Sequence, residues 1–212
     1  MLCFKCIVSR YRLLLLRKFT TYLKLVKNLI QNYSREKSSS EPTFDLFETP
    51  NISKLRCMSK KLRFYEQKRG LLFQNILGSF FGFKNYVEHE DGIDIISYDH
   101  KIAIELKYRS NTDNHSSRSF NNEKLRKFKR KNKNYRVIYA FINCSSAAKT
   151  SVGLTKSITF GDETIEYVYG VKVFELIYND AFLFMIKFIK NELCKNDINI
   201  DDTDADSVIS DF

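Results

Sequence analysis

The chain has 212 residues, of which 43% are hydrophobic and 14% aromatic, so it suits one compact domain with extensions and is not a disordered chain. Its formal net charge of +10 favours an anionic partner, either nucleic acid or an acidic membrane surface. The five cysteines are scattered and odd in number, which argues against a disulfide framework and for a reducing compartment. No run of about 18 apolar residues is present, so no membrane span is expected.

The first 50 residues are expected to form a basic extension and a linker. Residues 1–35 contain eight lysines or arginines and no acid, with LLLL at 13–16. Three interpretations stay open for them: an amphipathic helix packed on the domain, an organelle-targeting segment, or a poorly ordered basic arm. The serine-rich stretch 34–45 is typical of a linker. We expect an intracellular protein, in the cytoplasm or nucleus, unless residues 1–35 direct it to an organelle.

Helix and strand patterns alternate over residues 51–195, which we expect to form the domain. Apolar residues three and four positions apart predict a helix over 55–83. A strand is expected to begin at Gly92, and β-branched and aromatic residues predict another over 135–143. The positions that carry the helical pattern are Leu72, Phe73, Ile76, Leu77 and Phe80.

Towards the C-terminus, SITFGDETIEYVYG predicts a hairpin that turns at Gly161-Asp162, and VKVFELI follows it. A last helix is expected over 179–193, capped by Asn179 or Asp180. Residues 196–212 are acidic and are expected to form a disordered tail. This order of elements predicts an α/β fold with a central mixed β-sheet flanked by helices.

The hairpin GIDIISYDHKIAIELK carries charged residues where a plain strand pair needs none. Two alternating apolar runs flank Asp99-His100, which predicts a two-residue turn with Tyr98 paired to Lys101. In that register Asp94 lies directly opposite Glu105, and opposed residues share one face of a sheet. The apolar residues expected on the other face are Ile93, Ile95, Ile102, Ile104 and Leu106.

Opposed carboxylates on adjacent strands indicate a cation site, because their Cβ atoms are only about 4.5–5.5 Å apart and the charges repel each other. A hard ion such as Mg²⁺ suits these ligands, and it would polarise a phosphoryl oxygen and help to deprotonate a water. Lys107, on the same face, could orient that water or neutralise charge on the phosphate. The alternative is an ordinary charged outer face of a hairpin, since D-x(n)-E-x-K is short and frequent by chance.

A strongly basic segment follows the hairpin, from Arg118 to Arg136, with nine lysines or arginines against the single acid Glu123. Leu125 and Phe128 predict a short helix whose basic side chains face solvent. Because such a segment repels itself unless an anion neutralises it, we expect a phosphate backbone as its partner. The polar loop before it offers short donors to phosphates or bases, unless it is a plain turn-rich loop. The expected DNA-binding residues are Asn111, Thr112, Asn114, Ser116, Ser117, Arg118, Lys124, Lys127, Arg130 and Lys131.

The pattern GID, ten residues and ELK, between a helix and a basic helix, resembles the PD-(D/E)xK nuclease superfamily. More narrowly, ELKYRSNTDNHSS is similar to the ELKN-x-x-NT-x-NSSS stretch of type II restriction endonucleases that cut GGNCC or GGWCC sites. Asn75, Gly78 and Phe80 match that group's N-x-x-G-x-F positions on a helix, and YVYGVKVFELI is similar to its ending. The resemblance covers residues 66–193.

This resemblance implies a restriction-endonuclease-like core and a Mg²⁺-dependent enzyme that cuts double-stranded DNA. The sequence departs from the group at Ile93 (proline), Tyr108 (asparagine) and Phe81-Gly82 (His-Gln). The residues implied are Asp94 and Glu105 as Mg²⁺ ligands with the Leu106 carbonyl as a third, Lys107 as the catalytic lysine, and Gln74 or Glu66 as an additional polar residue from the first helix.

Four hypotheses follow from these patterns. The first is a Mg²⁺-dependent type II restriction endonuclease, a homodimer if it recognises a palindrome. The second is a repair or mobile-element nuclease of the same fold with loose sequence preference. The third is a basic nucleic-acid-binding module without catalysis, and the fourth is a membrane-surface protein docked by residues 1–35.

Overall fold

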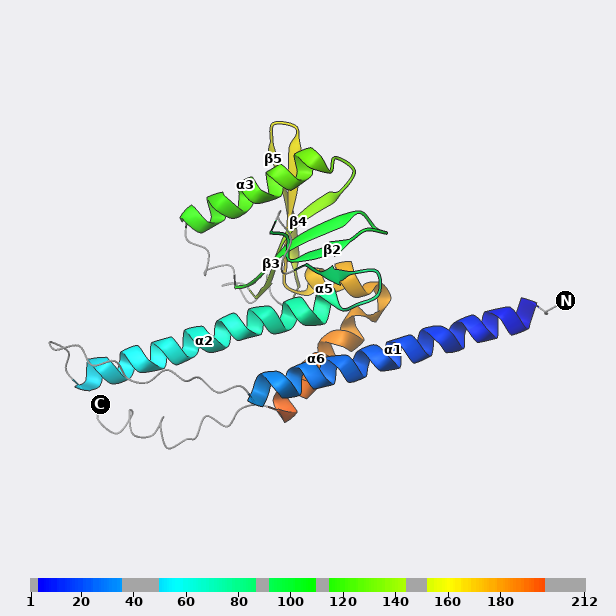
Figure 1. Ribbon diagram of the computed structural model, residues 1–212, viewed down its shortest axis with the longest axis horizontal. Coiled ribbons are helices and arrows are strands. Elements are labelled where there is room, and N and C mark those ends of the chain that lie inside the picture. The colour runs from blue at the N-terminus through cyan, green and yellow to red at the C-terminus, as the bar shows by residue number, and fades with distance from the viewer. Residues whose placement is uncertain (1–3, 36–49, 87–91, 110–114, 144–151, 197–212) are drawn as a thin grey trace.

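The computed structural model describes residues 4–35, 50–86, 92–109, 115–143 and 152–196. No helix within these residues combines the length and the apolar character that a membrane span requires. The elements, shown in Figure 1, are α1 (Phe4–Arg35), α2 (Pro50–Gly78), β1 (Lys84–Asn85), β2 (Ile95–Ser97), β3 (Ile102–Arg109), α3 (His115–Lys131), β4 (Arg136–Asn143), β5 (Leu154–Phe160), β6 (Glu163–Tyr169), α5 (Val171–Tyr178), the 3-10 helix η1 (Asn179–Ala181) and α6 (Phe182–Lys195).

Six strands form one mixed sheet in the order β1-β2-β3-β4-β6-β5. The central strands β3, β4 and β6 run parallel to one another, whereas the β1–β2, β2–β3 and β5–β6 pairs are antiparallel. Parallel neighbours need a crossover connection, and α3 supplies it between β3 and β4. The predicted α/β fold with a mixed sheet flanked by helices is therefore confirmed.

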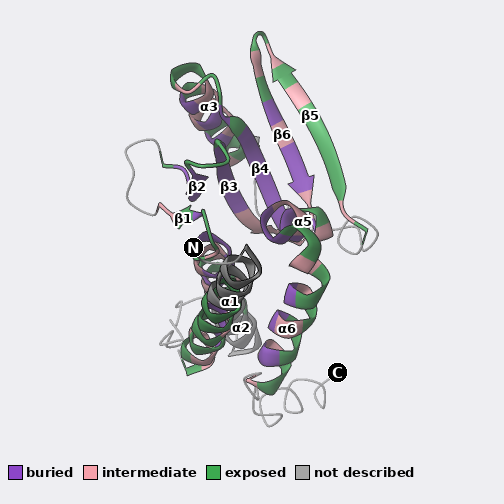
Figure 2. Cartoon of the chain, turned by 90° about the vertical axis from the view of Figure 1, so that its right-hand side faces the viewer, coloured by how far each residue is buried: buried purple, intermediate pink, exposed green. Residues whose placement is uncertain are grey.

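Helices cover both faces of the sheet (Figures 1 and 2). Along β4 the side chains alternate between two apolar clusters, with Ile138 on one face and Tyr139 on the other. The first cluster includes residues of α1, α2, α5 and α6, and the second includes Leu125 and Phe128 of α3. Because the central strand is buried on both faces, it is apolar throughout rather than alternating with polar residues.

The helix α1 packs on the domain, as the first of the three interpretations predicted. Tyr22, Val26 and Ile30 recur every four residues and are buried in the larger cluster. The Tyr22 hydroxyl donates to the Ile76 carbonyl at 2.8 Å and lies 2.6 Å from the Tyr178 hydroxyl. The second half of α1 is therefore part of the core, and targeting by this segment stays a prediction.

The N-x-x-G-x-F positions of α2 dock the end of this helix on β1. Asn85 donates from its side-chain amide to the side-chain oxygen of Asn75. A Cβ added at Gly78 would lie 3.0 Å from the Asn85 backbone, so only glycine lets the helix approach this closely. The Phe80 ring meets the Tyr178 ring edge-on at 4.7 Å, which holds the chain as it leaves the helix.

The register predicted for the β2–β3 hairpin is confirmed, with Ile95 paired to Ile104 and Ser97 paired to Ile102. The turn is longer than the predicted two residues, because all four residues 98–101 form it. Lys101 takes a φ of 52°, in the left-handed region, to close this turn.

The start of the hairpin differs from the prediction in two respects. β2 begins at Ile95 rather than at Gly92, because the chain bends at Asp94. The bend breaks the alternation of a strand, so Ile93 packs in the α3-side cluster and not with Ile95 and Ile104 on the opposite face. Asp94 thus stands at the end of the strand, where its side chain can reach the neighbouring strand.

The C-terminal part confirms the hairpin at Gly161-Asp162 but contains a helix that the predicted order lacks. VKVFELI lies in α5, and the Asn179 backbone N–H donates to the Glu175 carbonyl at the end of this helix. The predicted cap of the last helix is wrong, because α6 has Ala181 as its N-cap and no side-chain hydrogen bond there. Most of the linker and the acidic tail lie outside the described residues.

Candidate active site

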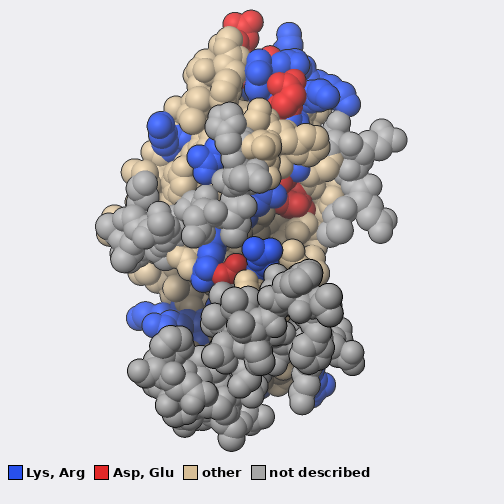
Figure 3. Space-filling model, turned by 90° about the vertical axis from the view of Figure 1, so that its left-hand side faces the viewer, with Lys and Arg blue, Asp and Glu red and all other residues tan. Residues whose placement is uncertain are grey.

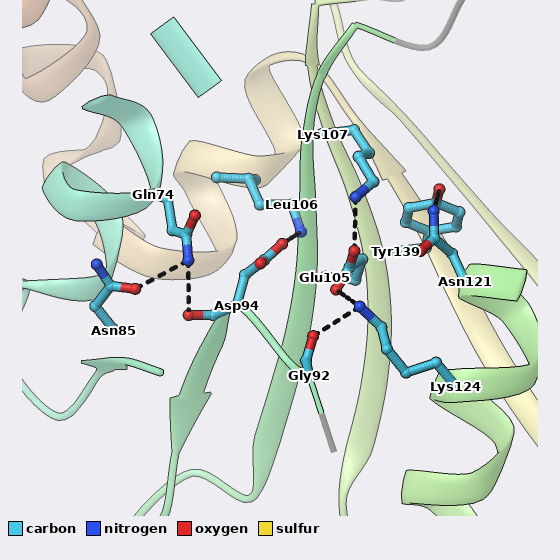
Figure 4. A network of polar contacts seen from close by, with 10 residues as sticks. All are labelled: Gln74, Asn85, Gly92, Asp94, Glu105, Leu106, Lys107, Asn121, Lys124 and Tyr139. Atoms are coloured by element: carbon cyan, nitrogen blue, oxygen red, sulfur yellow. Dashed lines mark hydrogen bonds and ion pairs between the residues drawn. The ribbon is translucent and has the colours of Figure 1, made fainter. Parts of the chain in front are cut away.

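The polar side of β3 lies beneath α3 and is buried. Glu105 is only 1% exposed. Its Oε1 pairs with Lys107 Nζ at 2.7 Å, and its Oε2 pairs with Lys124 Nζ at 2.5 Å, as Figure 4 shows. A buried carboxylate needs such partners, because taking an unpaired charge out of water is costly. Glu105 is therefore not a solvated charge on an outer face.

Asp94 faces the same part of β3 from the bend that precedes β2. Its Oδ2 accepts a hydrogen bond from the Leu106 N–H at 2.7 Å. Burial, followed by the charge of Glu105, raises the pKa of Asp94 to about 6, although the Leu106 amide and the two lysines act in the opposite direction. The structure thus brings Asp94, Glu105 and Lys107 together, with Lys124 as a fourth charged group.

Gln74 supports the bend from α2. Its side-chain amide donates to the side-chain oxygen of Asn85 at 3.0 Å and to the Asp94 carbonyl at 3.4 Å (Figure 4). These contacts fix the backbone that carries the Asp94 carboxylate. Asn85 has no counterpart among the residues singled out from the sequence, because a single asparagine in a two-residue strand has no recognisable pattern.

Glu66 lies outside the group formed by Asp94, Glu105 and Lys107. It pairs with Arg109, at the end of β3, at 2.5 Å. Both residues line a cavity of about 460 Å³ that Tyr108 also lines. The Tyr108 ring stacks on Phe73 at 5.8 Å on the face opposite Glu105, so the departure from asparagine at this position leaves the Glu105 face unchanged.

Lys124 reaches Glu105 because α3 is anchored on the sheet on either side of it. One turn earlier, the buried Asn121 donates to the Tyr139 hydroxyl at 3.0 Å. Leu125 and Phe128 are buried in the second cluster. The Lys124 ammonium also donates to the Gly92 carbonyl at 2.6 Å, and its side-chain carbons lie over that glycine, which has a φ of 65°.

The predicted solvent-facing position of Lys124 is therefore wrong. That prediction assumed that every basic residue of the helix faces solvent. The helical period itself places Lys124 three residues after Asn121 and four before Phe128, on the inner face. That spacing could have identified it as a residue of the site.

The remaining DNA-binding candidates are exposed, apart from the half-buried Ser117, or lie outside the described residues. Ser116, Ser117 and Arg118 stand near the start of α3, at the end of the polar loop. Lys127, Arg130 and Lys131 are exposed further along the helix. Asn111, Thr112 and Asn114 lie outside the described residues.

The positive charge of the basic segment, residues 118–136, is neutralised by more acidic partners than its composition predicted. Glu163 of β6 accepts hydrogen bonds from Arg126 at 3.1 Å and from Arg130 at 2.7 Å, and Glu123 pairs with both arginines. On the face shown in Figure 3, acidic side chains lie among the basic ones near the top. The sequence could not show this, because Glu163 is distant in the chain and only the sheet brings it beneath α3. Lys127 keeps an exposed position on this helix.

The oxygen atoms that Asp94 and the middle of β3 bring together fit a hard cation. No three His, Cys, Asp or Glu side chains gather within the part of the chain that the structure describes. Asp94 and Glu105 supply two carboxylates, and the Leu106 carbonyl points to the same edge as its N–H, which bonds Asp94. Mg²⁺ commonly takes one or two carboxylates, keeps several waters and binds substrate phosphate. This oxygen donor set therefore suits Mg²⁺.

Comparison with known proteins agrees with this arrangement. The family model of the Eco47II restriction endonuclease matches residues 24–194, which include all six strands and α3. Asp94, Glu105 and Lys107 all lie within the match, and it supports the resemblance to the PD-(D/E)xK superfamily. A search of curated proteins finds no significant match. The chain belongs to the Eco47II restriction endonuclease family.

Proposed function

We propose that this protein is a Mg²⁺-dependent endonuclease that hydrolyses phosphodiester bonds in double-stranded DNA. The observation that carries the proposal is the buried cluster in the middle of β3, beside the start of β2. There Glu105 is 1% exposed, paired with two lysines and close enough to Asp94 for its charge to raise the Asp94 pKa. Buried carboxylates with a perturbed pKa and specific charged partners are an arrangement that functional sites use.

In this proposal Asp94, Glu105 and the Leu106 carbonyl hold the cation, and Gln74 fixes the Asp94 backbone. When bound, Mg²⁺ would polarise a phosphoryl oxygen and favour a water-derived nucleophile at neutral pH. Lys107 is 29% exposed in its side chain, so it can leave Glu105 and reach a phosphate at the rim of the site. There its ammonium would orient the attacking water or neutralise charge that develops on the phosphate.

The DNA backbone would lie along the exposed side of α3 and the loop before it. Arg118, Lys127, Arg130 and Lys131 are exposed on this helix and are suited to phosphate contacts. The GGNCC or GGWCC site specificity implied by the ELKYRSNTDNHSS stretch belongs to the proposal, as does a homodimer that reads a palindrome. We further propose an intracellular enzyme whose domain over 51–195 is completed by the buried second half of α1 and is followed by an acidic tail.

The test is cleavage of supercoiled plasmid by the purified full chain, with MgCl₂ or with EDTA. We expect cutting in Mg²⁺ only, and loss of cutting in Glu105→Gln and Lys107→Met. Discrete bands support a restriction enzyme, and a smear supports a nuclease with loose sequence preference.

Three results would contradict the proposal. Cutting in EDTA would show that the reaction does not need a metal ion. Cutting that survives Glu105→Gln would place the site elsewhere. DNA binding without cutting, under every divalent cation tried, would favour a non-catalytic binding module.

A further inference from the structure

The two lysines that pair with Glu105 differ in exposure and in the element that carries them. Lys107 comes from the same strand, two residues away, and its side chain is 29% exposed. Lys124 comes from α3, and its side chain is 18% exposed. It has a second acceptor in the Gly92 carbonyl at 2.6 Å, and its aliphatic carbons pack on that glycine. Of the two, Lys124 has the less exposed side chain.

Each lysine holds a different oxygen of the same carboxylate. Lys124 takes Oε2 and Lys107 takes Oε1. An ammonium and a cation bound to the same carboxylate oxygen repel each other, so we expect one of these two bonds to open in the working enzyme. Lys107 has the more exposed side chain and is the catalytic lysine of the proposed mechanism, so we expect it to turn towards a phosphate. Lys124 would then keep Oε2 in place and so fix the direction of Oε1.

We propose that Lys124 is a positioning residue that anchors Glu105 through Oε2 and leaves Oε1 for the cation. This inference rests on the proposed nuclease function. It separates Lys124 from the backbone-binding lysines of the same helix, among which the sequence had placed it. It also links α3, whose outer side is basic, to the reaction centre, because a shift of this helix would move Glu105.

The first experiment is a double-mutant cycle in EDTA with Lys124→Met, Glu105→Gln and the double variant, followed by thermal unfolding. Removing the lysine leaves a buried carboxylate with one partner fewer, so Lys124→Met should lower the Tm by at least about 5 °C. In the Glu105→Gln background the same substitution should lower the Tm much less. Equal shifts in both backgrounds would overturn the proposal. The double variant also guards against a single variant that does not fold.

The second experiment measures cleavage at saturating DNA and Mg²⁺. Loss of a residue that orients a metal ligand typically costs about 10–100-fold in activity, so we expect that fall in the kcat of Lys124→Met and partial recovery in Lys124→Arg. The matched variant is Lys127→Met, one turn along on the exposed side. It should instead raise KM and reduce the slope of log Kd against log salt by about one.

These measurements distinguish failure of this inference from failure of the proposed function. If Glu105→Gln abolishes cutting but Lys124→Met keeps its kcat, only the positioning role is overturned, whether or not the thermal cycle shows coupling. If Lys124→Met behaves like Lys127→Met, Lys124 is a DNA-backbone contact and the inference fails. If the wild-type chain does not cut DNA at all, the proposed function fails and the positioning role falls with it.

Discussion

The two faces of the sheet bury different kinds of polar groups, although the same strands form both faces. The face covered by α1, α2, α5 and α6 is apolar, and its central polar contact is the neutral pair of Tyr22 and Tyr178. On the face covered by α3, Glu105 sits among apolar residues with two lysine partners. Apolar burial stabilises both faces, but the second face also holds buried charges, which are costly unless they stay paired. We infer that the α3 face carries the chemistry, whereas the opposite face contributes only to stability.

The sharpest test of this difference uses neighbouring residues of β3 that point to opposite faces. Lys107→Met should lower the single-turnover rate by about 10²–10³-fold, as expected when a charge that stabilises the transition state is lost. Tyr108→Phe should keep the wild-type rate, because its ring lies on the opposite face against Phe73. Rapid-quench kinetics on the two variants would make the comparison. A large loss of rate in Tyr108→Phe would show that the faces are not separated.

A second test removes apolar volume from the stabilising face. Ile104 is fully buried there, so Ile104→Ala should lower the free energy of unfolding by about 2–5 kcal/mol. The folded fraction should keep its cleavage rate. Urea unfolding followed by circular dichroism measures the first quantity, and the rate per folded molecule measures the second. A small stability loss with a large loss of rate would contradict the assignment of this face.

A third test concerns the tyrosine pair. Tyr22→Phe removes the bond to the Ile76 carbonyl and should cost about 1 kcal/mol of stability. Burial raises the pKa of both Tyr22 and Tyr178. Because the folded state holds the neutral form, this contribution is complete below about pH 10, the value of a free tyrosine, and is lost as the pH rises above it.

Thermal unfolding between pH 8 and pH 11 would follow this loss. The wild-type chain should lose stability faster than Tyr22→Phe over the alkaline part of the range. Parallel curves for the two chains would show that the pair does not titrate as its burial requires.

The smallest expected effect separates the basic residues of α3 from one another. Glu163→Gln removes the shared partner of Arg126 and Arg130, so both guanidinium groups gain positive potential towards DNA. Partly exposed ion pairs of this kind are weak, so DNA affinity should rise by less than about fivefold. Fluorescence anisotropy at several salt concentrations, without Mg²⁺, would measure the change. A fall in affinity would mean that Glu163 orders a DNA-binding surface rather than neutralising it.

The sequence by itself determined the local features. Alternation of apolar residues fixed the register of the β2–β3 hairpin, and therefore the proximity of Asp94 to Glu105, because a strand has a period of two. The helical spacing of Leu125 and Phe128 likewise predicted α3, and the motif around Glu105 indicated a nuclease family that the family match supports.

Only the tertiary structure decided which charges meet. In the folded sheet Glu163 lies beneath the arginines of α3 and pairs with them. Lys124 was expected at the surface, but the docking of α3 places it against Glu105. The bend at Asp94, which sends Ile93 to the other face, also depended on neighbouring strands. Local periodicity predicts which side of a helix or strand is apolar. It does not predict which distant side chain lies opposite that side, because this depends on how the elements pack.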